Sequence, residues 1–140
     1  MKISYEDNPS SEDLKLITDG IYTDANKKRG LDKLDHFCFF LRDKISKVVG
    51  AACGTMYYGC MYIDELWVED NYRRQGYGKD LMLQAEELAR NKDCKFITLN
   101  TMDFEARPFY EKLGYEIEFE RKGYFKSSIC YSLRKNLFKR

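Results

Sequence analysis

The segment Arg-Arg-Gln-Gly-Tyr-Gly, residues 73–78, lies where a predicted strand runs directly into a predicted helix. The strand, Met61 to Val68, is rich in β-branched and aromatic residues. The helix has apolar residues at positions 81, 85 and 88, which share one helical face. A glycine-rich turn at a helix start exposes backbone N–H groups at the positive end of the helix dipole. The segment therefore predicts an anion-binding turn, with phosphate as the favoured ligand.

The two glycines of this turn, Gly76 and Gly78, lack a Cβ, so a diphosphate could approach the main chain closely. The alternative is an ordinary turn between a strand and a helix. The turn is not G-x-G-x-x-G, and the P-loop pattern G-x-x-x-x-G-K followed by Ser or Thr does not occur in the chain. The two common nucleotide-binding folds therefore lack their fingerprints here.

Patterns along the chain predict helices and strands in the order αβββαβαββ. Pro9 to Asp13 carries a capping-box-like signal for a helix that reaches about Ala25, and residues 27–35 indicate a mainly polar loop. A short helix over Ala106–Leu113 ends at Gly114, which suits a left-handed C-terminal position. The crossover by the long helix predicts a mixed sheet with one parallel pair. The other predicted strands are Phe37–Leu41, Val48–Met56, Lys95–Thr101, Tyr115–Arg121 and Ser127–Leu133.

Composition narrows the class of partner. The chain has 24 basic and 23 acidic residues among 140, a net charge of +1, which gives no overall field that favours nucleic acid or a membrane surface. No apolar run approaches a membrane span, and the first residues lack the apolar core of a signal peptide. We expect a cytoplasmic protein without nucleic-acid or membrane partners.

The five cysteines, at positions 38, 53, 60, 94 and 130, have no zinc-site spacing, and His36 is the single histidine. We therefore expect no metal. Most of these cysteines lie in apolar runs and are interpreted as reduced core thiols, as in cytosolic proteins. His36 is interpreted as a core or surface residue, not a catalytic one.

A second segment, residues 106–115, reads Ala-Arg-Pro-Phe-Tyr-Glu-Lys-Leu-Gly-Tyr. On these two segments the chain resembles the GNAT superfamily of N-acetyltransferases. The family signature is Arg or Gln, then Gly three positions later and Gly or Ala two positions further on, which Arg73, Gly76 and Gly78 match. The second segment is similar to the family's tyrosine-containing block, and both occur in the expected order within residues 61–120. The resemblance implies an α/β (α+β) fold over residues 1–140 as a single domain, with splayed strands in a mixed central sheet and flanking helices.

The resemblance also implies acetyl-CoA as co-substrate. The amides of the Arg73–Gly78 turn would bind its pyrophosphate, with charged side chains nearby. The strand before the turn would splay from its neighbour, so that its main chain pairs with the pantetheine arm, and an N–H near Val68 would polarise the thioester carbonyl. Asn100 would hydrogen-bond the arm. The implied cofactor-binding residues are Leu66, Trp67, Val68, Arg73, Arg74, Gln75, Gly76, Tyr77, Gly78, Lys79 and Asn100.

Tyr110 matches the family tyrosine that protonates the sulfur of CoA. A phenol with a reference pKa near ~10 is protonated at neutral pH and can donate. The alternative is an aromatic residue packed beside Phe109 and Tyr115.

A base is needed because a lysine-like amine is almost fully protonated near neutral pH. Strand alternation places Asp64 on the same face as Leu66 and Val68 and places Glu65 on the opposite face. The segment around Asp64 is similar to one that carries a carboxylate base in some aminoglycoside 6′-N-acetyltransferases. An edge carboxylate that only solvates the strand, Glu65, and a water chain stay open as alternatives.

The acceptor is predicted from the residues around this base. Asp103 departs from the family's usual Asn and, with Glu105, adds negative charge. Tyr57, Tyr58 and Tyr62 suit cation–π contacts with an ammonium group, or simply a half-buried sheet face. We predict an acetyl-CoA-dependent N-acetyltransferase acting on a primary amine of a small cationic molecule of antibiotic or polyamine type. The alternatives are a protein N-terminal or lysine acetyltransferase and a non-catalytic acyl-CoA-binding module. Whether the chain forms a homodimer stays open.

Overall fold

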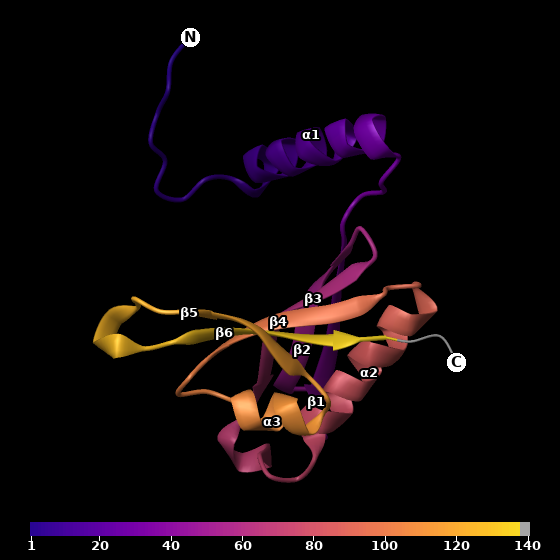
Figure 1. Cartoon of the computed structure of the whole chain (residues 1–140), viewed down its shortest axis with the longest axis vertical. Coiled ribbons are helices and arrows are strands. Elements are labelled where there is room, and N and C mark those ends of the chain that lie inside the picture. Colours follow the sequence, from indigo (N-terminus) through magenta and orange to yellow (C-terminus); the bar gives the residue numbers. More distant parts are fainter. Residues whose placement is uncertain (138–140) are drawn as a thin grey trace. The chain divides into compact units, whose positions relative to one another are not determined.

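The computed structural model describes residues 1–137 of the chain (Figure 1). Contacts within the chain define two units, Met1–Leu34 and Asp35–Arg140, which are described separately. The first contains α1 (Ser11–Arg29). The second contains β1 (Asp35–Arg42), β2 (Val48–Tyr57), β3 (Cys60–Val68), α2 (Tyr77–Asn91), β4 (Phe96–Met102), α3 (Arg107–Lys112), β5 (Glu116–Arg121) and β6 (Cys130–Asn136), with 3-10 turns at Asp70–Tyr72 and Phe125–Ser127.

Helix α1 begins and ends at identifiable caps. The Ser10 hydroxyl accepts a hydrogen bond from the Asp13 N–H at 3.1 Å, and Gly30, in the left-handed region at φ +65°, donates its N–H to the Asn26 carbonyl. The expected end near Ala25 is wrong. The helix continues to Arg29, because basic residues 27–29 are favourable at the negative end of the helix dipole.

The second unit is built on a six-stranded sheet in the order β1-β2-β3-β4-β6-β5. β3 and β4 are parallel, and the other neighbouring strands are antiparallel. The predicted element order and the mixed sheet with a parallel pair at the crossover are therefore confirmed. β5 and β6 form the long hairpin in orange and yellow in Figure 1.

One core cluster joins the sheet to α2 and α3. It contains Met61 and Ile63 of β3, Ile97 and Leu99 of β4, and Tyr110 of α3, together with three residues of α2 at positions 82, 85 and 89. Their close packing fixes β3, β4 and both helices relative to one another.

β3 and β4 separate before either strand ends. Their pairing covers Cys60–Ile63 and Phe96–Leu99, whereas β3 continues to Val68 beside β2 and β4 continues to Met102 beside β6. The expected splay is therefore confirmed. It leaves an opening between residues 64–68 and 100–102, with main-chain groups along both sides.

A β-bulge in β3 lies at the start of this opening. Glu65 pairs with Cys53 and Ile63 pairs with Gly54, so Asp64 is the extra residue. Ile63 and Leu66 both contact the core, although they are three residues apart. Strand alternation therefore does not hold across the bulge, and the predicted face shared by Asp64 and Leu66 is not supported by the register.

Gly54 is required by the bulge. A Cβ at this position would overlap the Tyr62 carbonyl oxygen and lie 3.1 Å from the Ile63 Cα. These are backbone atoms, which cannot move aside without breaking the β2–β3 ladder. Since the opening starts at this bulge, Gly54 supports the site from the neighbouring strand.

The interpretation of the cysteines as reduced thiols is wrong for two of them. Cys38 and Cys53 face each other across β1 and β2, with Cα atoms 4.1 Å apart, and form a disulfide. The pairing register creates this contact between positions fifteen residues apart, which spacing alone does not reveal. Cys60, Cys94 and Cys130 are free, and burial raises the pKa of the Cys60 thiol to about 11.

We predict that Gly54→Ala lowers the free energy of unfolding by about 2–4 kcal/mol, because a methyl group has no space against the bulge. Chemical denaturation monitored by circular dichroism measures the change. Ala51→Gly in the same strand is the matched control and should cost no more than about 1 kcal/mol. Equal and small effects would show that the bulge can shift without loss.

Candidate active site

A cavity of about 490 Å³ lies where β3 ends, beside the glycine turn. It joins the two sequence segments, because residues of the turn and residues 106 and 109 near α3 line the same space. Asp64, Gln75, Asn100 and Tyr110 are outside this lining set. The lining residues are Leu66, Trp67, Val68, Tyr72, Arg73, Arg74, Gly76, Tyr77, Gly78, Lys79, Ala106 and Phe109.

The two glycines of the turn occupy different structural environments. Gly76 is the N-cap of α2 at φ +87°, where other residues are strained, and open space surrounds its Cβ position. A Cβ on Gly78 would lie 3.4 Å from the Phe109 ring, so Gly78 is at the point where α2 meets α3. Arg74 also has a positive φ, +62°. Because the first N–H groups of an α-helix have no partner within the helix, the amides at the start of α2 are available to an anion.

The polar side chains of the turn differ in how they are held. The Nε of Arg73 donates to the Val68 carbonyl at 2.7 Å, and its guanidinium pairs with Asp70. Gln75 donates to the Asn71 carbonyl at 3.2 Å. Arg74 and Lys79 also line the cavity. Arg73 would have to leave Val68 or Asp70 to bind an anion in the cavity, whereas within residues 1–137 Arg74 and Lys79 have no such bond to break.

Main-chain direction along the end of β3 follows from one hydrogen bond. The Glu69 N–H donates to the Val49 carbonyl of β2 at 2.8 Å. Because successive residues of a strand point their main-chain groups to opposite edges, Trp67 also points toward β2. Leu66 and Val68 therefore point their N–H and C=O groups into the opening.

The opposite side of the opening is organised by Glu105. Its carboxylate accepts from the Met102 N–H at 2.8 Å, and its own N–H donates to the Met102 carbonyl at 3.0 Å. Met102 thus points away from β6, and alternation points the main chain of Asn100 into the opening too. The Asn100 side chain bonds Tyr62 and Ser132, at 3.2 and 2.7 Å.

Tyr110 is 7% exposed and lies between two aromatic rings, Phe109 at 5.2 Å and Tyr115 at 6.0 Å. Burial and, secondarily, the Glu105 carboxylate raise the pKa of Tyr110 to about 12. The phenol is therefore protonated throughout the neutral range. No buried side-chain polar atom of residues 1–137 lacks a hydrogen-bond partner.

An ion-pair network that the sequence did not suggest anchors the segment after Tyr110. Glu86 of α2 is 1% exposed and accepts hydrogen bonds from Tyr115 at 3.1 Å and Lys135 at 2.8 Å. Lys135 also donates to the Leu113 carbonyl at 2.8 Å. In the sequence, burial of Glu86 is indicated only weakly, by the i, i+4, i+7 spacing of Met82, Glu86 and Ala89 along one face of α2.

The remaining predicted residues lie around the bulge or on the surface. Asp64 is exposed, and its charge contributes to raising the pKa of both Tyr57 and Tyr62, after burial in each case. Glu65 is exposed and pairs with Cys53. The Asp103 N–H donates to the Ile129 carbonyl at 2.8 Å. Asp64 and Tyr62, whose hydroxyl accepts a hydrogen bond from Asn100, form a polar cluster at the start of the opening.

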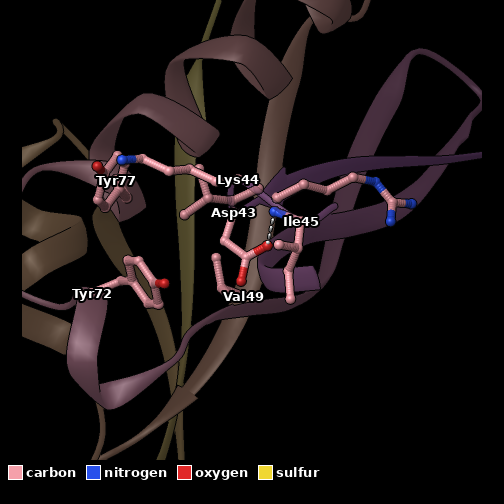
Figure 2. Close-up of a pocket in the computed structure, with 8 residues that line it drawn as sticks. Asp43, Lys44, Ile45, Val49, Tyr72 and Tyr77 are labelled. Carbon is pink, nitrogen blue, oxygen red and sulfur yellow. Dashed lines mark hydrogen bonds between the residues drawn. The ribbon is translucent and has the colours of Figure 1, made fainter. Parts of the chain in front are cut away.

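A second cavity, of about 600 Å³, lies between the β1–β2 turn and the start of α2 (Figure 2). Tyr72 and Tyr77 line both cavities, with ring centroids 6.4 Å apart. The Asp43 carboxylate is used within its own turn, where it accepts from Ile45 and Lys47 N–H groups. The sequence did not predict this cavity. Its lining is Leu41, Arg42, Asp43, Lys44, Ile45, Val49, Tyr72 and Tyr77.

No helix in residues 1–137 is long and apolar enough to cross a membrane. The same residues contain no group of three or more His, Cys, Asp or Glu side chains placed to hold a metal ion.

Residues 5–115 match the model of the Acetyltransferase (GNAT) family. The chain belongs to this family. The sequence resemblance to the GNAT family had implied the glycine turn and the splayed strands, and both are present in the structure.

Relatives and solved structures agree with this assignment. The chain is 32% identical over 72 residues to a blasticidin-S acetyltransferase of Streptomyces morookaense, a match that covers 51% of the chain and 53% of that protein. The chain thus spans about half the length of the curated relatives it matches.

Two solved structures place the fold. A candidate acetyltransferase from Agrobacterium tumefaciens superposes with a TM-score of 0.86 over 98% of this chain and 100% of that one, at 24% identity. A candidate streptothricin acetyltransferase from Bacillus anthracis, in complex with acetyl coenzyme A, gives 0.67 over 74% and 64%, at 22% identity.

We predict that Gly76→Asp lowers acetyl-CoA affinity at least tenfold, about 1.4 kcal/mol, because it adds a negative side chain beside the amides of the turn. Isothermal titration calorimetry measures the affinity. Gly59→Asp is the matched control, since Gly59 has a similar φ of +83° and open space, in the β2–β3 turn. Unchanged affinity in a folded Gly76→Asp protein would remove the phosphate assignment.

Proposed function

We propose that the chain is an acetyl-CoA-dependent N-acetyltransferase that modifies a primary amine on a small cationic molecule. The observation that carries this proposal is the opening between β3 and β4, which has the glycine turn at one end and Tyr110 in the core beside it. Family membership supports the reaction class, and the acetyl-CoA complex of the Bacillus anthracis protein supports the co-substrate.

The residues present fit acetyl-CoA. The turn offers amides for the pyrophosphate, with Arg74 and Lys79 as charge partners. The main chain of Leu66 and Val68 on one side, and of Asn100 on the other, can pair with the amide groups of the pantetheine arm, as an added strand would. The fit uses mostly backbone groups, which explains why distant sequences can share it.

The reaction supplied by the thioester is transfer of its acetyl group to the amine nitrogen, with formation of a C–N bond and cleavage of the C–S bond. The Val68 N–H points into the opening and can stabilise negative charge on the acetyl oxygen. Tyr110 carries a proton that the leaving thiolate needs. The amine must lose a proton first, to Asp64, to Glu65 or to a water chain.

The acceptor class rests on the polar cluster beside the opening. Asp64 is an exposed carboxylate two residues from Tyr62 on β3, and an ammonium group would gain from both its charge and the tyrosine ring face. Asn100 and Ser132 add hydrogen-bonding groups across the opening. The blasticidin-S acetyltransferase relative supports an antibiotic-type amine over a protein N-terminus or lysine.

The test is a thiol-release assay with acetyl-CoA over a panel of antibiotic amines, polyamines, and peptides with a free N-terminus or lysine. Native mass spectrometry with acetyl-CoA runs in parallel. Turnover of a small cationic amine supports the proposal. Turnover of peptides alone would contradict the acceptor class, and binding without any turnover would point to a non-catalytic acyl-CoA-binding module.

We predict that Tyr110→Phe lowers kcat by about 10²-fold or more, because it removes the positioned acid and keeps the ring. Acetyl-CoA affinity should change only a few-fold, since the hydroxyl matters most when charge develops on sulfur. The raised pKa predicts no loss of this proton donor as pH increases through 9 and 10. Tyr124→Phe, on the exposed loop of the β5–β6 hairpin, is the control. Wild-type turnover in Tyr110→Phe would contradict the assignment.

A further prediction separates the candidate bases. Asp64→Asn should raise the KM for a dicationic acceptor at least tenfold and lower kcat, whereas Glu65→Gln should change either by less than threefold. The steady-state kinetics of both variants decide between the two carboxylates. Equal small effects in both would leave the water chain as the route for the proton.

A further inference from the structure

Arg73 belongs to the lining of the cavity beside the glycine turn, and its side chain also reaches back to β3. Its Nε–H donates to the Val68 carbonyl at 2.7 Å, and its guanidinium pairs with Asp70, three residues earlier. A side chain that only supplied positive charge to a diphosphate would not need to occupy a strand carbonyl. The contact therefore suggests a second role for the first residue of the turn.

Val68 is a residue whose main chain the splay leaves exposed. The last β3–β4 pair is Ile63 with Leu99, so β4 does not pair with Val68. Both its N–H and its C=O point into the opening, because Glu69 points to β2. An unpaired carbonyl there would place partial negative charge next to the thioester oxygen and the diphosphate. Arg73 occupies this carbonyl.

We propose that Arg73 is a positioning residue for acyl transfer, which fixes the strand end so that the Val68 N–H faces the thioester carbonyl. The other edge of the same strand end is held by the Glu69 N–H on Val49 and by the Lys47–Glu69 ion pair at 3.6 Å. The strand end is thus fixed from both sides. The effect of Arg73 on acyl transfer rests on the proposed function, whereas its role in fixing the strand end does not.

Three substitutions separate the hydrogen bond from the charge. In Arg73→Gln the side-chain nitrogen occupies the same place along the chain as the arginine Nε, the fourth atom after Cα, so it can still donate to Val68 without a positive charge. Arg73→Met has a methyl group at that place and cannot donate. Arg73→Lys keeps the charge but carries its nitrogen one bond further out. The Arg73 side chain is 53% exposed, which makes these variants tolerable for folding.

The Gln and Met variants form the matched pair, because both are neutral and of similar length. We expect them to lose the same amount of CoA affinity, measured by calorimetry. At saturating acetyl-CoA, kcat of Arg73→Met should be at least tenfold below that of Arg73→Gln. In the ligand-free proteins, the Glu69 amide should exchange with deuterium at least tenfold faster in Arg73→Met than in Arg73→Gln. Asp70→Asn, which removes only the ion pair, should keep kcat within threefold.

The proposal is overturned if the Gln and Met variants match each other in kcat and in Glu69 exchange while Arg73→Lys resembles the wild type. That result would assign Arg73 to phosphate charge alone. If the wild-type chain acetylates no amine, the proposed function fails. The exchange of the Glu69 amide, measured without ligand, would still decide whether Arg73 holds the strand end.

Discussion

The separation of β3 from β4 after Ile63 and Leu99 is the constraint on which the site depends. Each strand keeps a partner on its other edge, β2 for β3 and β6 for β4, so the sheet stays paired while the inner edges open. Exposing main-chain groups in this way is tolerable because the opening is accessible and several of the groups have side-chain partners, Arg73 on one side and Glu105 on the other. The result is a backbone surface ready for an extended ligand.

The core keeps this opening in register with the helices that serve it. Met61, Ile63, Ile97 and Leu99 pack with α2 and α3, so the glycine turn and Tyr110 are fixed to the same body as the strands. Behind Tyr110, the buried Glu86 carboxylate ties α2 to Tyr115 and Lys135. Lys135 also donates to the Leu113 carbonyl, so the network connects α2 to the end of α3, and removing one partner of a buried charge typically costs about 3–5 kcal/mol.

Much of the fold could be predicted because it follows from local sequence patterns. These are the spacing of apolar residues in α2, the β-branched and aromatic composition of the strand before the turn, and the two glycines of the turn. The bulge at Asp64 could not be predicted from the sequence. An extra residue in a strand leaves the polar–apolar pattern unchanged but moves the residues after it to the other face of the sheet. The Cys38–Cys53 disulfide and the fit of Gly54 depend on register between strands. Glu86 and Arg73 appear in sequence as ordinary surface charges, and only their three-dimensional partners reveal what they hold.

The most direct test is a titration of the ¹⁵N-labelled chain with CoA, followed by amide NMR shifts. We expect the largest shifts at Leu66, Val68, Asn100 and the amides of residues 74–78, with much smaller ones at residues 43–47, the β1–β2 turn beside the second cavity. Shifts concentrated at residues 43–47, with Val68 and the turn unchanged, would contradict the assignment of the opening between β3 and β4 as the acetyl-CoA site.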